Sequence, residues 1–352
     1  MKIGIVGLPN IGKTSLFNLL TGCQARVDLF PFTTIEKNVG VVAVPDERLE
    51  QIARIVKPRI VTPAHINFVD IAGLVKGASQ GEGLGNRFLA HIREADLILH
   101  LVRNFNAPNI PHILGTVDPD RDVEIVESEL ALADLAIVEK RLESVKKEAP
   151  SKERDCLVTA LKKLLDQLEK GFHKPELSLE EQQVVKNLNL FILKPIVYAV
   201  NSSDTEPFDL SNFPLLASRN PVVFSAELEK NLFAFSESEK VELRQSLNLT
   251  PEGPQAIIKR CFSLLNLIRF YTIKGEESRA WSAPYGSTAL DAAFMIHTDI
   301  GKGFIKAEVV SFSDLIAAGG FLEAHSAGKV KIEGKSYQIQ DGDVLLIRFK
   351  PH

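Results

Sequence analysis

The chain has 352 residues, of which 45% are hydrophobic and 24% charged, and this length predicts about two or three domains rather than one compact core. The formal net charge of −4 excludes a general electrostatic attraction to nucleic acid or to an anionic membrane. No apolar run approaches the roughly 18 residues of a transmembrane helix, so no membrane span is expected.

The cysteines and the first residues bear on the compartment. Cys23, Cys156 and Cys261 are far apart and odd in number, which fits neither a metal site nor a disulfide framework and indicates a reducing compartment. The first ten residues have a short apolar run that Gly, Pro and Asn interrupt, without a small-residue cleavage site. We therefore expect a first strand rather than a signal peptide, and a cytoplasmic protein.

The first part of the chain alternates between strand and helix patterns. Apolar runs predict strands at 2–8, 38–44, 65–74 and 95–102. Periodic runs between them predict a helix at 13–22, stopping at Gly22, and another at 46–57, ended by Pro58. Strands separated by helices are typical of a mostly parallel sheet with helices on both faces.

A different pattern begins at about residue 119. Apolar residues there recur at intervals of four and three: Ala131, Leu135, Val138, Leu142 and Val145, and, after Pro150, Leu157, Leu161, Leu164 and Leu168. Charged residues fill the intervals, which favours two amphipathic helices joined by a short turn as an antiparallel coiled-coil hairpin. Two ordinary bundle helices are the alternative.

Strand patterns return at 195–200 and 222–226, so the sheet is expected to resume after the helical insert. A predicted helix at 253–268 then leads into a small α+β unit with one further helix at 289–297. Its short predicted strands are 269–273, 304–310, 329–334, 337–340 and 344–350.

The stretch from Gly7 to Thr14, GLPNIGKT, fits the phosphate-loop pattern G-x-x-x-x-G-K-[ST], and it follows a strand and opens a helix as the motif requires. Gly7 and Gly12 allow the backbone to fold around phosphates. Lys13 is expected to reach the β- and γ-phosphates and the Thr14 hydroxyl to bind Mg²⁺. A glycine-rich turn with an incidental lysine is the alternative.

A nucleotide switch needs two further features. FVDIAG supplies Asp70, expected to hold Mg²⁺ through water, and Gly73, whose N–H is expected to sense the γ-phosphate. FPFTTIEKN supplies Thr33 and Thr34, one of which should complete the Mg²⁺ shell, unless this stretch is only a surface loop.

Four glycines in the next stretch, 74–86, favour a segment that orders around a bound triphosphate, with a plain flexible loop as the alternative. They are Gly77, Gly81, Gly83 and Gly85.

Together with IHTDIGKGFIKAEVVSF near the C-terminus, these motifs resemble the YchF-type branch of the Obg-related P-loop NTPases essentially from end to end. The resemblance implies an α/β G domain at 1–118 and 186–262, a helical insert at 119–185, and a TGS domain of β-grasp fold at 266–352. It implies Mg²⁺-dependent triphosphate hydrolysis with a preference for ATP over GTP, coupled to translation on the ribosome. By matching position, the phosphates would contact Asn10, Ile11, Gly12, Lys13, Thr14 and Ser15, and Thr14 and Thr34 would bind Mg²⁺.

The group that orients the attacking water is open. Many related GTPases have a Gln directly after the D-x-x-G glycine, whereas this chain has Leu74, which cannot hydrogen-bond a water. Another residue, a bound monovalent cation such as K⁺, or a partner such as the ribosome must act instead, and intrinsic turnover is predicted to be slow. Lys13 and Gly73 are expected to act on the phosphates. His112 is the internal candidate for the water, with a packed loop histidine as the alternative.

The base-reading strand tip is expected at NSSD, with Asn201, Ser202 and Asp204, together with Ser225 and Ala226. Guanine-specific relatives have N-K-x-D and the YchF-type family typically N-x-x-E, so NSSD lies between the two patterns. Ser202 replaces the lysine of the first, and Asp204 replaces the Glu of the second. We expect ATP, with GTP as the alternative.

The partners are inferred from the resemblance and not from charge, because residues 266–352 carry equal numbers of basic and acidic side chains. We expect a monomer that binds the ribosome, without membrane contact, and with an RNA contact through the TGS or helical domain. Five lysines recur near the predicted strands but are more often solvated surface: Lys302, Lys306, Lys329, Lys331 and Lys335. The rival functions are an Obg-like GTPase in ribosome assembly, a nucleotide-gated adaptor whose hydrolysis is only a reset, and, least favoured, a metabolic kinase.

Overall fold

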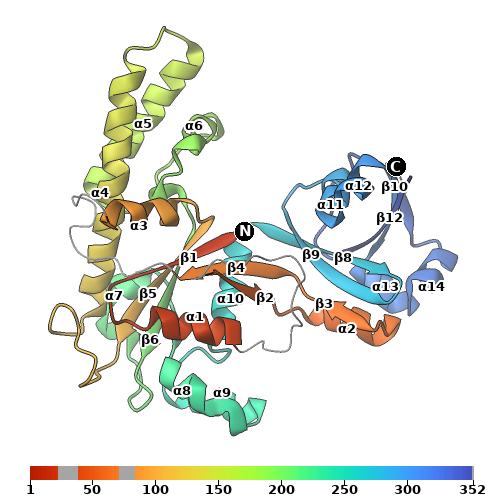
Figure 1. Cartoon of the computed structure of the whole chain (residues 1–352), viewed down its shortest axis with the longest axis horizontal. Coiled ribbons are helices and arrows are strands. Elements are labelled where there is room, and N and C mark those ends of the chain that lie inside the picture. Colours follow the sequence, from red (N-terminus) through yellow and green to blue (C-terminus); the bar gives the residue numbers. More distant parts are fainter. Residues whose placement is uncertain (23–38, 71–83, 351–352) are drawn as a thin grey trace. The chain divides into compact units, whose positions relative to one another are not determined.

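The computed structural model describes residues 1–22, 39–70 and 84–350, which form two compact units (Figure 1). The first unit comprises Met1–Gly40 and Asn67–Ile257, and the second Val41–Ile66 and Ile258–His352. The described residues form two six-stranded sheets, one mainly in each unit.

The first sheet has the strand order β2-β4-β1-β5-β6-β7. Its strands are β1 (Lys2–Val6), β2 (Val39–Ala43), β4 (His65–Asp70), β5 (Leu97–Asn104), β6 (Ile196–Ser202) and β7 (Val222–Phe224). The pairs β1–β4, β1–β5, β5–β6 and β6–β7 are parallel. Strand β5 is buried from Leu97 to Arg103, as a near-continuous apolar run in the middle of a parallel sheet requires. The α/β fold class predicted from the alternation of strands and helices is confirmed.

Helices connect these strands. The α-helices that lie wholly or mainly in the first unit are α1 (Lys13–Gly22), α3 (Leu84–Arg93), α4 (Pro119–Val145), α5 (Lys152–Lys170), α6 (Leu179–Val185), α7 (Pro214–Ser218), α8 (Ala226–Asn231) and α9 (Glu237–Ser246). Short 3-10 turns occur at η1 (Lys186–Leu188), η2 (Phe191–Leu193), η3 (Leu210–Asn212) and η4 (Leu232–Ala234). Helix α10 (Pro254–Leu264) runs across the boundary between the units. Gly85 lies in the first turn of α3, so the predicted loop ends earlier than expected.

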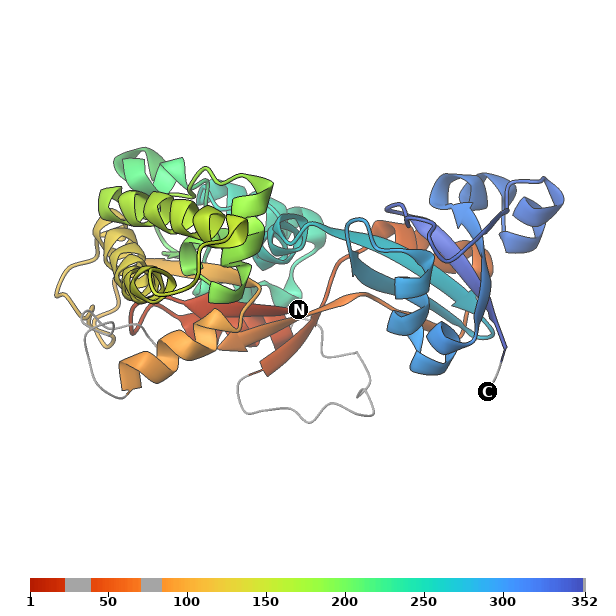
Figure 2. The same ribbon diagram turned by 90° about the horizontal axis from the view of Figure 1, so that it is seen from above.

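Helices α4 and α5 lie side by side and antiparallel, and Figure 1 shows them projecting from the sheet, whereas Figure 2 views them from above. Asp118 caps the N-terminus of α4 and Ser151 that of α5, by accepting hydrogen bonds from main-chain N–H groups. The apolar seam predicted from the 4-3 spacing is buried at Val138, Val145, Leu157, Leu161, Leu164 and Leu168. These side chains hold the hairpin together.

The second sheet has the order β11-β10-β12-β8-β9-β3. Its strands are β3 (Ile60–Thr62), β8 (Leu267–Lys274), β9 (Glu277–Pro284), β10 (Phe304–Ser311), β11 (Lys331–Glu333) and β12 (Asp343–Phe349). Its helices are α2 (Glu47–Val56), α11 (Ala289–Ile296), α12 (Thr298–Lys302), α13 (Phe312–Ala318) and α14 (Phe321–Ser326). One apolar cluster includes α11, and a second includes α2, α13 and α14.

Helix α2 forms where expected, but it packs in the second unit rather than with the predicted G-domain residues 1–118. Leu49 and Ile52 share an apolar cluster with Tyr271, and the Tyr271 hydroxyl donates a 2.8 Å hydrogen bond to Asp46 Oδ2. An amphipathic helix can cover any complementary apolar face, so its pattern alone does not choose the sheet.

Several shorter elements were not predicted. In the first unit these are α3, α6, α7, α8 and α9, and in the second β3, β9, α12, α13 and α14. The predicted strand at 337–340 is reduced to an isolated bridge between Gln338 and Thr288.

Candidate nucleotide site

The phosphate loop joins β1 to α1 and requires glycine at two positions. Gly7 has φ +147° and Gly12 φ +94°. A Cβ on Gly7 would lie 2.4 Å from the Leu101 carbonyl oxygen, and one on Gly12 would lie 2.5 Å from Asn201 Nδ2. Any larger residue would therefore push the loop away from the strand ends that support it.

Lys13 is folded into the loop. Its side chain is buried, and its ammonium group donates hydrogen bonds to the carbonyl oxygens of Gly7 (3.2 Å) and Leu8 (2.8 Å). Burial lowers the pKa of Lys13 to about 8, although the nearby Asp70 carboxylate opposes this shift. A phosphate group beside Lys13 would oppose this shift and favour the charged ammonium form.

Thr14 and Asp70 meet at the carboxyl edge of the sheet. Asp70 ends β4, which is parallel to β1, and Thr14 is the second residue of α1. The Thr14 hydroxyl donates a 2.9 Å hydrogen bond to Asp70 Oδ2. A hydroxyl and a carboxylate brought together in this way are the oxygen ligands that Mg²⁺ prefers.

Two neighbouring strand residues hold two successive carbonyl groups of the phosphate loop. Arg103 on β5 and Asn201 on β6 are partners in the strand register. Arg103 Nη1 donates to the Asn10 carbonyl oxygen (3.0 Å), and Asn201 Nδ2 donates to that of Ile11 (3.1 Å). Both side chains are buried. Side chains from two neighbouring strands of the sheet therefore hold the phosphate loop in place.

Asn201 also reaches the second predicted base loop, since its Oδ1 accepts a 2.9 Å hydrogen bond from the Ala226 N–H. Ser225 is fully buried and caps α8 by accepting from the Leu228 N–H. The structure thus brings the phosphate loop and the Ser225–Ala226 loop together through one amide side chain.

The other two strand-tip residues differ in exposure. Ser202 is buried and accepts a 3.4 Å hydrogen bond from Asn104 Nδ2, whereas Asp204 is exposed beyond the end of β6. Of Asn201, Ser202 and Asp204, Asp204 is therefore the residue with an exposed side chain.

His112 is buried and both of its ring nitrogens are engaged. Nδ1 accepts a 3.2 Å hydrogen bond from the Leu114 N–H, so Nε2 carries the proton and donates to Asp122 Oδ2 at 2.7 Å. Asp122 lies in the first turn of α4. A role for His112 in orienting water would require one of these hydrogen bonds to break.

Comparisons with known proteins place this geometry in a family. Residues 2–138 match a family model described as 50S ribosome-binding GTPase, and residues 267–350 match a YchF GTPase C-terminal model described as a protein of unknown function (DUF933). A Bacillus subtilis (strain 168) relative, named ribosome-binding ATPase YchF, is 42% identical over 363 aligned positions, with 99% of each chain covered. The chain belongs to the YchF family.

Further relatives agree. An Escherichia coli O157:H7 protein of the same name is 43% identical over 358 positions, again covering 99% of each chain. A solved structure described as the Schizosaccharomyces pombe YchF GTPase has a TM-score of 0.85 and 33% identity, covering 99% of this chain and 97% of that one. The predicted YchF-type resemblance is confirmed, and with it a P-loop nucleoside triphosphate hydrolase.

Several predicted YchF-type features fall outside the described residues, namely Thr33, Thr34, Gly73 and Leu74. Asn10, Ile11, Gly12, Lys13, Thr14, Asp70, Asn201 and Ala226 are brought together around the phosphate loop by the contacts above. In residues 1–22, 39–70 and 84–350, no group of three or more His, Cys, Asp or Glu side chains is arranged to hold a metal ion. The same ranges contain no helix that is both long and apolar enough to cross a bilayer.

Sequence reasoning missed Arg103 and Asp122. The signal for Arg103 was available, because an arginine inside the apolar run LILHLVRN must find polar partners when the strand is buried. Asp122 gave no such signal, since it lies among other charged residues at the start of a helix.

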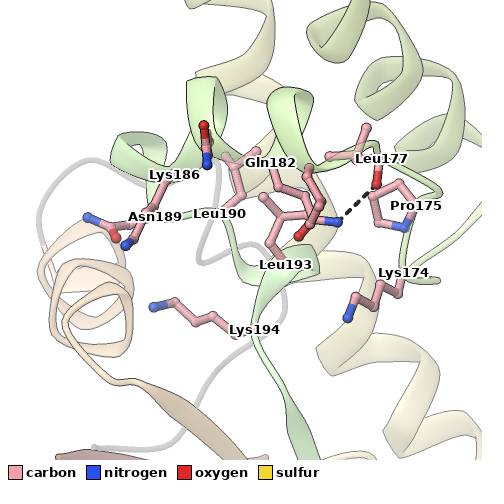
Figure 3. A pocket seen from close by; sticks show the side chains of 11 residues that line it. Lys174, Pro175, Leu177, Gln182, Lys186, Asn189, Leu190, Leu193 and Lys194 are labelled. Carbon is pink, nitrogen blue, oxygen red and sulfur yellow. Dashed lines mark hydrogen bonds between the residues drawn. The ribbon is translucent and has the colours of Figure 1, made fainter. Parts of the chain in front are cut away.

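A separate cavity of about 390 Å³ lies in the first unit beside α6 and η2, among residues 174–194 (Figure 3). Apolar side chains such as Leu190 and Leu193 line it together with Lys174, Lys186 and Lys194. The residues predicted for nucleotide binding are not among those that line it.

Proposed function

We propose that the chain is a ribosome-associated, nucleotide-dependent switch that binds ATP with Mg²⁺, hydrolyses it slowly, and acts in translation or its regulation under stress. The observation that carries this proposal is the meeting of the phosphate loop with Asp70, where Thr14 Oγ1 and Asp70 Oδ2 lie 2.9 Å apart beside the buried Lys13. The choice of ATP and of the ribosome as a partner rests on the names of the bacterial relatives, which are called ribosome-binding ATPases.

The oxygen atoms of Thr14 and Asp70 fit Mg²⁺, because a hydroxyl and a carboxylate already meet there. Thr14 would bind the ion directly and Asp70 through water, and we propose Thr34 as a further ligand. When bound, Mg²⁺ supplies positive charge that neutralises the β- and γ-phosphate oxygens. Lys13 adds its ammonium charge to the same phosphates, and the N–H groups from Asn10 in the phosphate loop to Ser15 in the first turn of α1 orient them. Gly73 is proposed to sense the γ-phosphate.

We propose ATP as the bound nucleotide because Ser202 occupies the position where guanine-specific relatives have lysine. GTP is the second candidate, on a specific observation: Asp204 is exposed and its carboxylate could accept hydrogen bonds from guanine N1–H and the 2-amino group. The fungal relative is described as a GTPase. Adenine offers neither of these donors, so Asp204 discriminates between the two proposals.

Slow hydrolysis follows from the position after Gly73, which is Leu74. We propose that His112, released from Asp122, or a bound monovalent cation such as K⁺, or the ribosome supplies the polar group that orients water. In the described arrangement His112 is held away from that task by its two hydrogen bonds.

We propose a monomer whose helical hairpin or TGS-like unit contacts ribosomal RNA or protein. Because ribosomes lie in the cytoplasm, this function implies a cytoplasmic protein. A second possibility is an adaptor that uses hydrolysis only to reset itself. A variant that binds ATP but does not hydrolyse it distinguishes this adaptor from a switch that needs hydrolysis. Such a variant should keep its cellular function if the chain is an adaptor.

Equilibrium binding of ATP and GTP in the presence of Mg²⁺ is the central test. We expect ATP to bind at least about tenfold more tightly, a difference of about 1.4 kcal/mol. GTP binding tenfold more tightly would overturn the choice of ATP, and the Asp204→Glu variant would then show whether this carboxylate sets the preference. Ribosome co-sedimentation with ATP, with ADP and without nucleotide tests the partner.

A further inference from the structure

Arg103 is among the largest side chains that the structure buries completely, at 1% exposed. It is the penultimate residue of β5. Its guanidinium group donates to three main-chain carbonyl oxygens: that of Asn10 at 3.0 Å from Nη1, that of Ile110 at 2.8 Å from Nη2, and that of Phe105 at 2.9 Å from Nε. The Phe105 ring lies 4.2 Å from Arg103 Cζ.

This arrangement is costly for a residue that only fills space. A buried guanidinium group loses its hydration, and hydrogen bonds to neutral carbonyl groups compensate for this loss less than an ion pair with a carboxylate would. An apolar residue would suit a buried parallel strand better. The rigid fork of donors does something that an apolar residue cannot, because it binds two separate chain segments at fixed positions. One is the phosphate loop at Asn10, and the other is the segment that follows β5.

A second contact joins the same two segments. Asn10 has φ +64°, and its Nδ2 donates a 3.3 Å hydrogen bond to the Pro111 carbonyl oxygen in the segment after β5. Asn10 therefore contacts residues 110 and 111 indirectly through its carbonyl group and directly through its amide. A displacement of Asn10 must be followed by that segment or must break these hydrogen bonds.

The contacts continue from there into the helical hairpin. Pro111 is followed by His112, which donates to Asp122 in the first turn of α4. Arg121 binds the other end of the segment, donating to the Thr116 carbonyl oxygen at 2.6 Å and to Asp122 Oδ1 at 3.0 Å. A continuous series of contacts thus runs from the phosphate loop to the start of the 27-residue helix α4.

We propose that Arg103 is a positioning residue that transmits the state of the phosphate loop to segment 105–118, and so sets whether His112 is bound to Asp122. The proposal rests on the proposed function, since it needs a nucleotide that moves the loop. The two states differ in the hydrogen bond between His112 and Asp122, which is made in one state and broken in the other. Its breaking would free His112 toward the nucleotide and release the start of α4 together.

The test is amide hydrogen exchange of the full-length chain, without nucleotide and with Mg²⁺–ADP or a non-hydrolysable Mg²⁺–ATP analogue. We expect peptides covering 105–122 to change protection between these states in the unsubstituted chain. Arg103→Lys, which keeps the charge but loses the fork, should remove this difference. Asp122→Asn should keep the response of residues 105–111 and lose that of the start of α4.

Steady-state kinetics separates positioning from a general loss of structure. For Arg103→Lys we expect kcat to fall about tenfold, with the Kd for nucleotide changed less than about threefold. Arg48→Lys is the matched control, because Arg48 also uses its fork, on Asp341 at 2.8 and 3.2 Å, but lies in the second unit. It should leave both kcat and the exchange of 105–122 unchanged.

The outcomes distinguish the two proposals. Failure of the unsubstituted chain to bind ATP or GTP would overturn the proposed function. Normal binding without any nucleotide-dependent change in 105–122 would overturn the role of Arg103 alone. A nucleotide-dependent change that persists in Arg103→Lys would also overturn it. If Arg103→Lys does not fold, Asp122→Asn decides, because an unchanged response at the start of α4 would refute transmission through this route.

Discussion

Thr14 Oγ1 donates a 2.9 Å hydrogen bond to Asp70 Oδ2, which joins the first helix to the end of a strand 56 residues later. The strand register explains the proximity, because Ile5 and Asp70 are partners in parallel strands whose carboxyl ends share one edge. A divalent cation bound at this edge would be held by the Thr14 hydroxyl oxygen and, through water, by the Asp70 carboxylate.

The first prediction removes this hydroxyl. Thr14→Val keeps the shape of the side chain but not the oxygen, so the gain in nucleotide affinity that Mg²⁺ provides should fall by about tenfold or more. Titrations with Mg²⁺ and with a chelator measure this gain. Thr21→Val is the control, since among the described residues Thr21 Oγ1 bonds to the carbonyls of Phe17 and Asn18 in α1. An undiminished Mg²⁺ effect in Thr14→Val would exclude Thr14 as a ligand.

The second prediction follows from the pKa of Lys13, which burial lowers to about 8. Phosphate oxygens favour the ammonium form, so above pH 8 nucleotide binding must take up a proton. Affinity should therefore fall as pH rises through 8, by up to about tenfold per pH unit. Calorimetry in two buffers of different ionisation enthalpy should detect proton uptake on nucleotide binding at pH 9. The same measurement at pH 7 should detect no proton uptake by Lys13. Lys13→Arg, if it binds, should show no uptake at either pH.

The phosphate loop and Asp70 could be predicted because their positions follow from local rules. A loop between a strand and a helix lies at the carboxyl edge of a parallel sheet, and so does the last residue of a neighbouring strand. The roles of Arg103 and Asp122 depend on which carbonyl groups lie nearby after folding, and no local pattern encodes that. The amphipathic pattern of α2 likewise did not specify which sheet it covers, and α2 packs with residues of the second unit.

The third prediction concerns stability in acid. His100 is buried on β5 beside Tyr198, with 5.3 Å between ring centroids, and burial lowers the pKa of His100 to about 3, with Arg219 acting in the same direction. Between about pH 6.5 and 3 the unfolded chain binds a proton that the folded chain does not, so the free energy of unfolding falls as pH falls. The loss from this group approaches about 1.4 kcal/mol per pH unit.

Urea unfolding at pH 7.5, 6 and 5 measures this slope. His100→Phe should flatten it, whereas His325→Gln, at an exposed position, should not. A residual slope is expected from His65 in the second unit, whose pKa burial lowers to about 4. An identical slope in His100→Phe and the unsubstituted chain would show that His100 does not titrate differently on folding.

The fourth prediction concerns the attachment of the hairpin to the sheet. Asp134 on α4 is fully buried, and its carboxylate accepts from Arg93 Nη1 at 2.8 Å and from the Ile192 N–H at 2.9 Å. Asp134→Ala leaves a partly buried guanidinium and a main-chain donor without this acceptor, so unfolding should become easier by about 3 kcal/mol. Glu139→Ala, at an exposed position on the same helix, should cost less than about 0.5 kcal/mol. If Asp134→Ala matched Glu139→Ala in denaturant unfolding, the ion pair would contribute nothing to stability, and the apolar seam between α4 and α5 and the other contacts of α4 would have to hold the hairpin in place.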